Sequence, residues 1–192
     1  MSYYREQLET YLKEIRLEPC RVLDVGGGEK RLQGRVKNIE LCDYLVFDNN
    51  AEFNPDIFAD INYYFKELHP EKRFDVVFCL EVMEYVFDPV TVHRNIFNFL
   101  KDAGVAYISY PTIYPLHNPP GIDYLRYSKN AIEKLLAEVG FQTWEITPRV
   151  ATEGALFLQK FYTSEGMHPM KNTDEIYHIG YLVKCFKKGA NL

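Results

Sequence analysis

The stretch that decides the fold is Arg21-Val22-Leu23-Asp24-Val25-Gly26-Gly27-Gly28. The β-branched and apolar residues before the glycines indicate a short buried strand, and the three glycines indicate a sharp turn after it. Glycines in this position let the backbone approach a ligand closely, although a plain tight turn would use them as well. A second strand is expected at 44–47, and Asp48 follows it, 22 residues after Gly26.

Strands and helices alternate through the rest of the chain. Helical spacing of apolar residues predicts a first helix capped by Ser2, and a short helix is expected over 29–36. Two longer helices are expected to begin at Asp88-Pro89 and Ser128 and to end at Gly104 and Gly140. Further strands are expected at 57–59, 74–79, 105–109, 141–147 and 177–186. This alternation predicts an α/β fold, a single doubly wound domain with a mostly parallel seven-stranded sheet and an antiparallel C-terminal edge hairpin.

The composition is that of one globular domain. The chain has 192 residues, 47% of them hydrophobic, and a formal net charge of −5, so it has no excess of positive charge for binding phosphate backbones. No apolar run is long enough to span a membrane, and the N-terminus has no signal-peptide block. Four cysteines without a CxxC pair argue against structural zinc and fit a reducing compartment. We expect a cytoplasmic monomer or homodimer that binds a small molecule, with no metal, nucleic-acid or membrane partner.

Asp48 and the glycines together indicate a nucleoside-containing cofactor. Ligands of an open α/β sheet bind beyond the carboxyl ends of its strands, and an acid about 20 residues after the glycines suits the ribose hydroxyls. An N-cap or a solvated turn would also explain Asp48. A dinucleotide favours GxGxxG, but counting from Gly26 places Arg31 where the third glycine should stand. This spacing weakens the case for a dinucleotide.

At this point the chain resembles the class I S-adenosylmethionine-dependent methyltransferases. Their loop DxGxGxG matches Asp24 through Gly28, with Lys30 in place of the third glycine. Residues 74–89 are similar to the family's fourth-strand block, FDxVxxxxVLEHVxDP, except that Tyr85 stands where His is common. The likeness runs from about residue 21 to residue 145. It implies S-adenosylmethionine as the cofactor and S-adenosylhomocysteine as the product.

The resemblance also implies a set of cofactor-binding residues. Asp48 would bind the ribose, and Asp60 with Ile61 would bind adenine through a carboxylate for the exocyclic amine and an apolar shelf for the ring. The expected set is Asp24, Gly26, Gly27, Gly28, Asp48, Asn49, Asp60, Ile61, Leu80, Glu81 and Tyr85. Within a single methyltransferase-like domain, 1–192, we expect an N-terminal helix (1–18), a cofactor-binding core (21–148), a variable insertion (149–176) and a last strand (177–187).

A proline-rich loop, 110–128, follows the fifth strand and is expected to extend over the carboxyl ends of the strands, where an acceptor would bind. His117 is the candidate catalytic base, because histidine titrates near neutral pH, but it would equally serve to anchor the loop. Tyr114, Asp123 and Arg126 are the other candidate substrate-binding residues. Asp123 would orient His117 or pair with Arg126, and Arg126 would clamp an anionic substrate group or fix the loop. A similar loop pattern occurs in small methyltransferases linked to sugar or surface-polysaccharide biosynthesis.

The sequence therefore predicts methyl transfer from S-adenosylmethionine to a small-molecule acceptor, as O-methylation of a hydroxyl, with a sugar as one candidate. Alignment of donor and acceptor supplies much of the acceleration in such a transfer, and a hydroxyl also needs a base. Two alternatives stay open from the sequence. One is a non-catalytic family member that binds the cofactor in a structural or regulatory role, and the other is a nicotinamide-dependent oxidoreductase.

Overall fold

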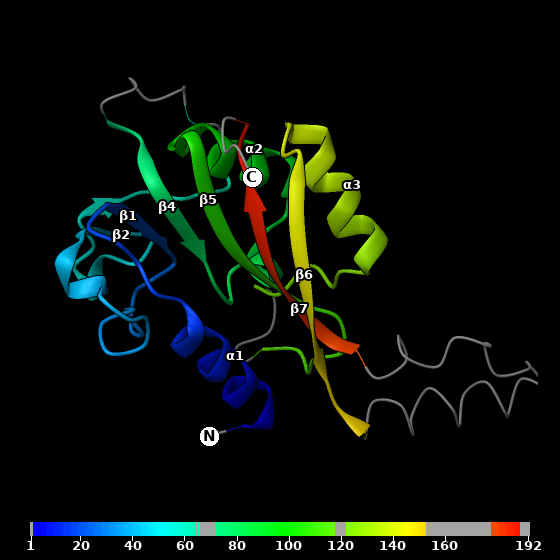
Figure 1. Cartoon of the computed structure of the whole chain (residues 1–192). Coiled ribbons are helices and arrows are strands. Elements are labelled where there is room, and N and C mark those ends of the chain that lie inside the picture. Colours follow the sequence, from blue (N-terminus) through cyan, green and yellow to red (C-terminus); the bar gives the residue numbers. More distant parts are fainter. Residues whose placement is uncertain (1, 64, 66–71, 118–121, 153–177, 189–192) are drawn as a thin grey trace, which may run out of the picture.

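The computed structural model describes residues 2–63, 65, 72–117, 122–152 and 178–188. A seven-stranded sheet with the order β3-β2-β1-β4-β5-β7-β6 forms the centre of this described part (Figure 1). The strands are β1 (Arg21–Val25), β2 (Asp43–Asp48), β3 (Ile57–Phe58), β4 (Phe74–Cys79), β5 (Leu100–Pro111), β6 (Thr143–Val150) and β7 (His178–Phe186). Strands β1 to β5 pair in parallel, whereas β7 runs antiparallel to both β5 and β6. The predicted fold class is confirmed.

The α-helices of the described part are α1 (Tyr3–Glu14), α2 (Pro89–Phe99) and α3 (Lys129–Val139). Each begins at its expected cap: the side chains of Ser2, Asp88 and Ser128 accept hydrogen bonds from backbone N–H groups three residues later. Gly140 ends α3 with φ +106°, a conformation that a Cβ would disfavour. None of the helices in the described ranges is long and apolar enough to cross a membrane.

The helix predicted over 29–36 is wrong, because this segment forms turns and bends. Gly34 has φ +73°, which interrupts any helix at that residue. The backbone N–H of Leu32 donates to the hydroxyl of Tyr44 at 3.2 Å rather than to a helical carbonyl. A contact with the neighbouring strand thus replaces the local hydrogen bond that a helix would need.

Two boundaries also differ from expectation. Leu100 already begins β5, so α2 ends at Phe99 and the prediction that it ends at Gly104 is wrong. Strand β6 continues to Val150, two residues into the segment 149–176. The added start of β5 pairs with β4, where Leu100 lies opposite Phe74, and the added end of β6 pairs with β7, where Arg149 lies opposite Gly180.

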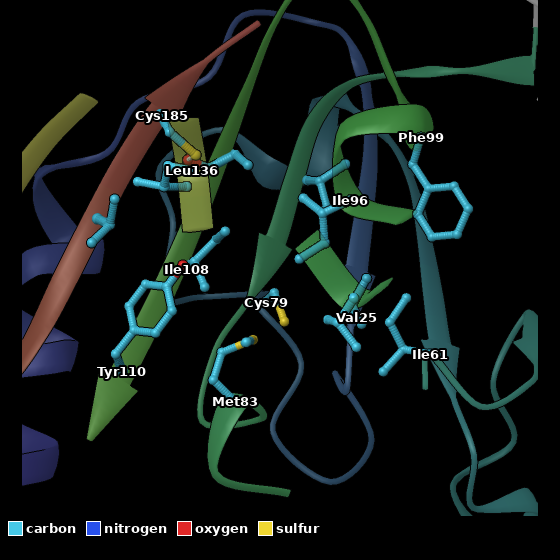
Figure 2. Packing of buried hydrophobic residues seen from close by; sticks show 14 of the residues in the cluster. Val25, Ile61, Cys79, Met83, Ile96, Phe99, Ile108, Tyr110, Leu136 and Cys185 are labelled. Carbon is cyan, nitrogen blue, oxygen red and sulfur yellow. Dashed lines mark hydrogen bonds between the residues drawn. The ribbon is translucent and has the colours of Figure 1, made fainter. Parts of the chain in front are cut away.

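The apolar core has two layers, because alternate residues of a buried strand point to opposite faces of the sheet. On one face, Val22 of β1 and Val76 of β4 pack in a cluster with Leu8 and Leu12 of α1. The cluster on the other face lies against α2 and α3, and Figure 2 shows part of it. Its members include Leu23, Val25, Val77, Cys79, Ile96, Ile108 and Leu136. The helices therefore cover both faces of the sheet, and the carboxyl ends of the strands remain available for a binding site.

Asn95 of α2 is a fully buried polar residue that fastens the chain after β3. Its Nδ2 donates to the carbonyls of Ile61 at 2.9 Å and Tyr63 at 2.7 Å. Its Oδ1 accepts from the N–H of Phe65 at 3.1 Å. One amide side chain therefore satisfies three backbone groups of a segment without regular structure, and it fixes Ile61 in place.

We predict that Asn95→Ala lowers the free energy of unfolding by about 2–4 kcal/mol, since it leaves these backbone groups without partners. Urea unfolding followed by circular dichroism measures this change. Asn98→Ala is the matched control, a half-buried asparagine of the same helix, and it should cost less than about 1 kcal/mol. If the two variants lower the free energy of unfolding equally, the Asn95 hydrogen bonds do not stabilise the fold.

Candidate functional site

Two cavities adjoin at the carboxyl ends of β1, β2 and β4, next to the point where the strand order reverses. Doubly wound sheets bind their ligands at this place. The larger cavity has a volume of about 660 Å³, within the range of roughly 300–1,000 Å³ found for small-molecule sites. Gly26, Asp48 and Glu81 line both cavities, which therefore form one continuous site.

All eleven residues expected to bind the cofactor line this site. Three of the eleven, Gly26, Asp48 and Glu81, line both cavities, as does Phe53. Of the other eight, Asp24, Gly27, Gly28 and Leu80 line the smaller cavity, and Asn49, Asp60, Ile61 and Tyr85 line the larger one. The sequence did not indicate that α1 contributes, yet Arg5 and Leu8 line the smaller cavity. The first helix therefore forms part of the wall of the smaller cavity.

The glycine turn is built against the end of β2. Gly26 has φ +72°, and its N–H donates to the carbonyl of Phe47 at 2.7 Å. A Cβ on Gly28 would lie 2.7 Å from Oδ2 of Asp48, and the N–H of Gly28 donates to that oxygen at 3.0 Å. The other Asp48 oxygen accepts from the N–H of Asn50 at 2.8 Å. The turn and the Asp48 carboxylate are thus held as one unit.

Asp24 supports the turn from the end of β1. Its side chain is buried and accepts a hydrogen bond from the hydroxyl of Tyr44. Burial raises the pKa of Asp24 to about 7, and the Tyr44 hydrogen bond opposes this rise. Because Tyr44 also accepts from Leu32, the contact connects β1, β2 and the segment after the glycines.

Glu81 follows β4 and has φ +57°, a left-handed conformation that is costly for a residue with a Cβ. Ser109 of β5 holds it on two sides: its hydroxyl accepts from the Glu81 N–H at 2.7 Å and donates to Oε1 at 2.7 Å. The same Oε1 accepts from Nη1 of Arg149 at 2.8 Å. Three hydrogen bonds therefore hold this strained turn in place at the junction of the two cavities.

Arg149 is a residue of the site region that sequence reasoning missed. It lies in β6 with its side chain fully buried, and its Nη2 donates to the carbonyl of Tyr4 at 3.1 Å. The guanidinium also lies over the Tyr4 ring, 3.5 Å from the centroid. The segment 149–176 has no period, so no signal distinguishes Arg149 there, and 153–176 lie outside the described residues.

The loop after β5 is fixed by Arg126. Its guanidinium forms a bidentate ion pair with Asp123 and donates to the carbonyls of Tyr114 and Pro115. The hydrogen bonds from Arg126 hold the pKa of Asp123 well below its usual range. These contacts match the loop-fixing interpretation of Arg126, since each guanidinium nitrogen donates within the loop.

His117 lies between two tyrosines at the edge of the site. Its ring centroid is 4.9 Å from that of Tyr85 and 5.0 Å from that of Tyr114. Its Nδ1 lies 2.9 Å from Oδ2 of Asp123, and its backbone N–H donates to the same oxygen at 2.9 Å. The four loop residues expected to bind substrate line neither of the two cavities; Ile122 and Tyr124 of the same loop line the larger one.

Glu84 is a second acid that the turn after β4 brings to the site. It lies in the 3₁₀ helix η4 (Met83–Tyr85), and only 3% of it is exposed. Burial raises the pKa of Glu84 to about 7, and the nearby Glu81 carboxylate raises it further, whereas His117 and Arg126 oppose this rise. Its Oε1 lies 3.9 Å from Nε2 of His117. The sequence placed Glu84 near the cofactor block but gave no sign that it would be buried.

Residues 2–146 match the methyltransferase-domain family, so the chain belongs to that family. Its fold is that of the class I S-adenosylmethionine-dependent methyltransferases, and the chain is an enzyme of this class with S-adenosylmethionine as its cofactor. This membership decides for a methyltransferase over the nicotinamide-dependent oxidoreductase.

Solved structures share the fold at low sequence identity. An S-adenosylmethionine-dependent methyltransferase from Mesorhizobium loti has a TM-score of 0.61 at 14% identity, covering 97% of this chain and 98% of that one. Phosphoethanolamine N-methyltransferase 2 of Haemonchus contortus, in complex with S-adenosyl-L-methionine, has a TM-score of 0.60 at 14% identity, covering 95% and 53%. The CurJ carbon methyltransferase has a TM-score of 0.60 at 15% identity, covering 96% and 52%. A comparison with curated proteins gives no significant match.

The buried carboxyl of Glu84 should make stability depend on pH. The pKa of a free glutamate carboxyl is about 4.5, and burial raises that of Glu84 to about 7 in the fold. Between these values the folded chain binds more protons than the unfolded chain, so stability falls as pH rises. Glu84→Gln should abolish this loss, and its stability relative to the wild type should rise by on the order of 3 kcal/mol from pH 4.5 to pH 8. Urea unfolding across this interval measures the difference.

The control for this comparison is Glu138→Gln, which neutralises an exposed acid at the end of α3. Its stability should follow that of the wild type at every pH. If Glu84→Gln also runs parallel to the wild type, the carboxyl of Glu84 is solvated rather than buried.

Proposed function

We propose that this methyltransferase transfers the methyl group of S-adenosylmethionine to a hydroxyl group of a small-molecule acceptor, with sugars as the acceptor class to test first. The observation that carries the proposal is the His117–Asp123 pair. Its Nδ1–Oδ2 separation of 2.9 Å fits an imidazole that donates from Nδ1 and keeps Nε2 as an acceptor. The pair lies against Tyr85, which lines the larger cavity.

The residues around the two cavities fit the cofactor. The lack of a side chain at Gly28 leaves room beside the Asp48 carboxylate, where a Cβ would lie only 2.7 Å from Oδ2. Asp48 would accept hydrogen bonds from the ribose hydroxyls, and Asp60 with the buried Ile61 would hold the adenine. When bound, the cofactor supplies a methyl group on a positively charged sulfur, already activated for displacement.

A hydroxyl acceptor needs a base, and His117 fits this role better than Tyr85. Burial raises the pKa of Tyr85 to about 12, so its phenol stays protonated at neutral pH. Imidazole accepts a proton near neutral pH. Asp123 holds Nδ1, and Arg126 in turn holds Asp123, so the imidazole is oriented by contacts within its own loop. In this proposal His117 removes the hydroxyl proton during methyl transfer, while Arg126 positions it.

The fold alone does not choose the acceptor atom. Structures similar to this chain include an enzyme named for N-methylation and one named for carbon methylation. The hydroxyl assignment therefore depends on the base at position 117, which a soft or already nucleophilic acceptor would not require. The sugar class depends on the loop pattern of residues 110–128.

The ribose placement predicts the effect of Asp48→Ala on cofactor affinity. Loss of the charged acceptor should weaken S-adenosylhomocysteine binding by about 1.5–3 kcal/mol. Calorimetric titration measures this, with Asp43→Ala, an exposed acid at the other end of the same strand, as the control that should bind like the wild type. Unchanged affinity in Asp48→Ala would mean that the ribose lies elsewhere.

The base assignment predicts the effect of His117→Ala on turnover. With a sugar or sugar-nucleotide acceptor found by screening for methyl transfer, the variant should lose roughly 10²- to 10⁴-fold in kcat. Its affinity for S-adenosylhomocysteine should stay as in the wild type, and added imidazole should restore part of the rate. Leu116→Ala, an exposed neighbour in the same loop, should leave kcat unchanged. A full rate in His117→Ala would refute the base.

A further inference from the structure

Glu84 carries a buried carboxyl that the proposed transfer does not yet use. Its Oε2 is buried and has no hydrogen-bond partner among the described residues. Buried polar atoms are nearly always satisfied in proteins, and exceptions often mark a group with a chemical task. The hydroxyl of Tyr4 and Nε of Arg149 are the other two such atoms in the described part of the chain. Of the three, Glu84 is the one that adjoins the candidate base.

The imidazole of His117 lies between two carboxyl groups, one at each ring nitrogen. Asp123 contacts Nδ1 at 2.9 Å, and Oε1 of Glu84 lies 3.9 Å from Nε2. The second distance is too long for a hydrogen bond in this state but short enough that a small movement would close it. The nitrogen that would receive a proton from an acceptor, Nε2, is therefore also the ring nitrogen nearest the Glu84 carboxyl.

Hydrogen bonds to two backbone carbonyls connect the 3₁₀ helix that carries Glu84 to the loop that carries His117. The carbonyl of Glu84 accepts from the N–H of Tyr124 at 2.7 Å and from that of Leu125 at 3.3 Å. The hydroxyl of Tyr127 donates to the carbonyl of Met83 at 2.9 Å. The backbones of the 3₁₀ helix η4 and of residues 124–127, which follow His117 in the same loop, are therefore held together by these bonds.

Building on the proposed function, we propose that Glu84 stores the proton that His117 removes from the acceptor hydroxyl. The acceptor O–H bond breaks as its proton bonds to Nε2 of His117, and the oxygen electron pair forms the bond to the methyl carbon. The bound cofactor would supply the methyl group, and its sulfur would keep the electron pair of the broken methyl–sulfur bond. The proton then passes from Nε2 to Oε1 of Glu84, which changes from carboxylate to carboxylic acid and returns His117 to its neutral form.

Glu84 acts here as a positioning residue, because it reaches the acceptor only through His117. The charged and titratable groups that face it come from every element packed around η4. They are Tyr4 of α1, Cys79 of β4, Glu81 of the turn after β4, Tyr85 of η4 itself, and His117, Arg126 and Tyr127 of the loop and its end. Asp123 and Arg149 act on it only through their ion pairs with Arg126 and Glu81. Burial and the Glu81 carboxylate raise the pKa of Glu84 to about 7, so the deprotonated carboxylate that can accept a proton predominates only above about pH 7.

The first test is the pH profile of kcat with the acceptor found for the proposed function. In the wild type kcat should rise with pH through about 7, as the Glu84 carboxylate forms. Glu84→Gln should lose this rise and fall roughly tenfold or more at pH 8, whereas KM stays similar. Glu84→Asp, which keeps a carboxyl, should recover part of both the rate and the rise. A Glu84→Gln profile that keeps the wild-type shape would overturn the proposal.

A second test needs no turnover and therefore separates this inference from the proposed function. With ¹³C-carboxyl-labelled glutamate, the Glu84 signal, identified by its absence in Glu84→Gln, should titrate near pH 7. In His117→Asn the midpoint should move to higher pH, because the imidazole no longer favours the charged carboxylate, and Leu116→Ala should leave it unchanged. If the midpoint of the Glu84 titration moves by less than about 0.2 pH unit in His117→Asn, the two side chains do not interact electrostatically, and the proposal is wrong.

The two tests divide the outcomes. In one outcome, the Glu84 titration shifts in His117→Asn but His117→Ala keeps its full turnover rate. Glu84 and His117 then interact, but His117 is not the base and the proposed function fails. If His117→Ala loses turnover but the carboxyl titration ignores His117→Asn, the base is right and Glu84 is only a loop anchor.

Discussion

The ion pair between Arg149 and Glu81 is the interaction on which the site depends. The guanidinium of Arg149 is fully buried, so removing Glu81 would strand a charge, which typically costs about 3–5 kcal/mol. The same guanidinium contacts the carbonyl and the ring of Tyr4. One side chain thus joins α1, β6 and the turn after β4, and together with Ser109 it holds Glu81, whose backbone has a left-handed conformation.

The turn after β4 serves both halves of the site. Glu81 lies at the junction of the two cavities, where the cofactor is expected. Three residues later, Glu84 lies beside His117, and its carbonyl fastens the loop after β5. A strained turn is a suitable element for this task, because its contacts leave it little freedom to relax. In the proposed function, this one turn would position both the donor and the acceptor, as an in-line transfer requires.

Features set by neighbouring residues could be predicted from the sequence, and features set by distant contacts could not. The glycine turn and the helix caps depend on only a few consecutive residues, so the local sequence is enough to predict them. Arg149 reaches Glu81 across 68 positions, and no local pattern marks an arginine that will be buried. The burial of Glu84 likewise depends on a loop that returns from β5. The helix expected over 29–36 failed for the same reason, since a tyrosine of β2 takes an N–H that the helix would use.

The central claim is that the continuous site at the strand ends is built for S-adenosylmethionine, and direct calorimetric titration of the wild-type chain tests it. The account predicts saturable binding of S-adenosylhomocysteine at one site per chain and no binding of NAD under the same conditions. Binding of NAD without S-adenosylhomocysteine would contradict it, because the acid after β2 and the glycine turn would then hold a dinucleotide. Binding of neither would mean that the side chains gathered around Gly26, Asp48 and Glu81 do not form a cofactor site.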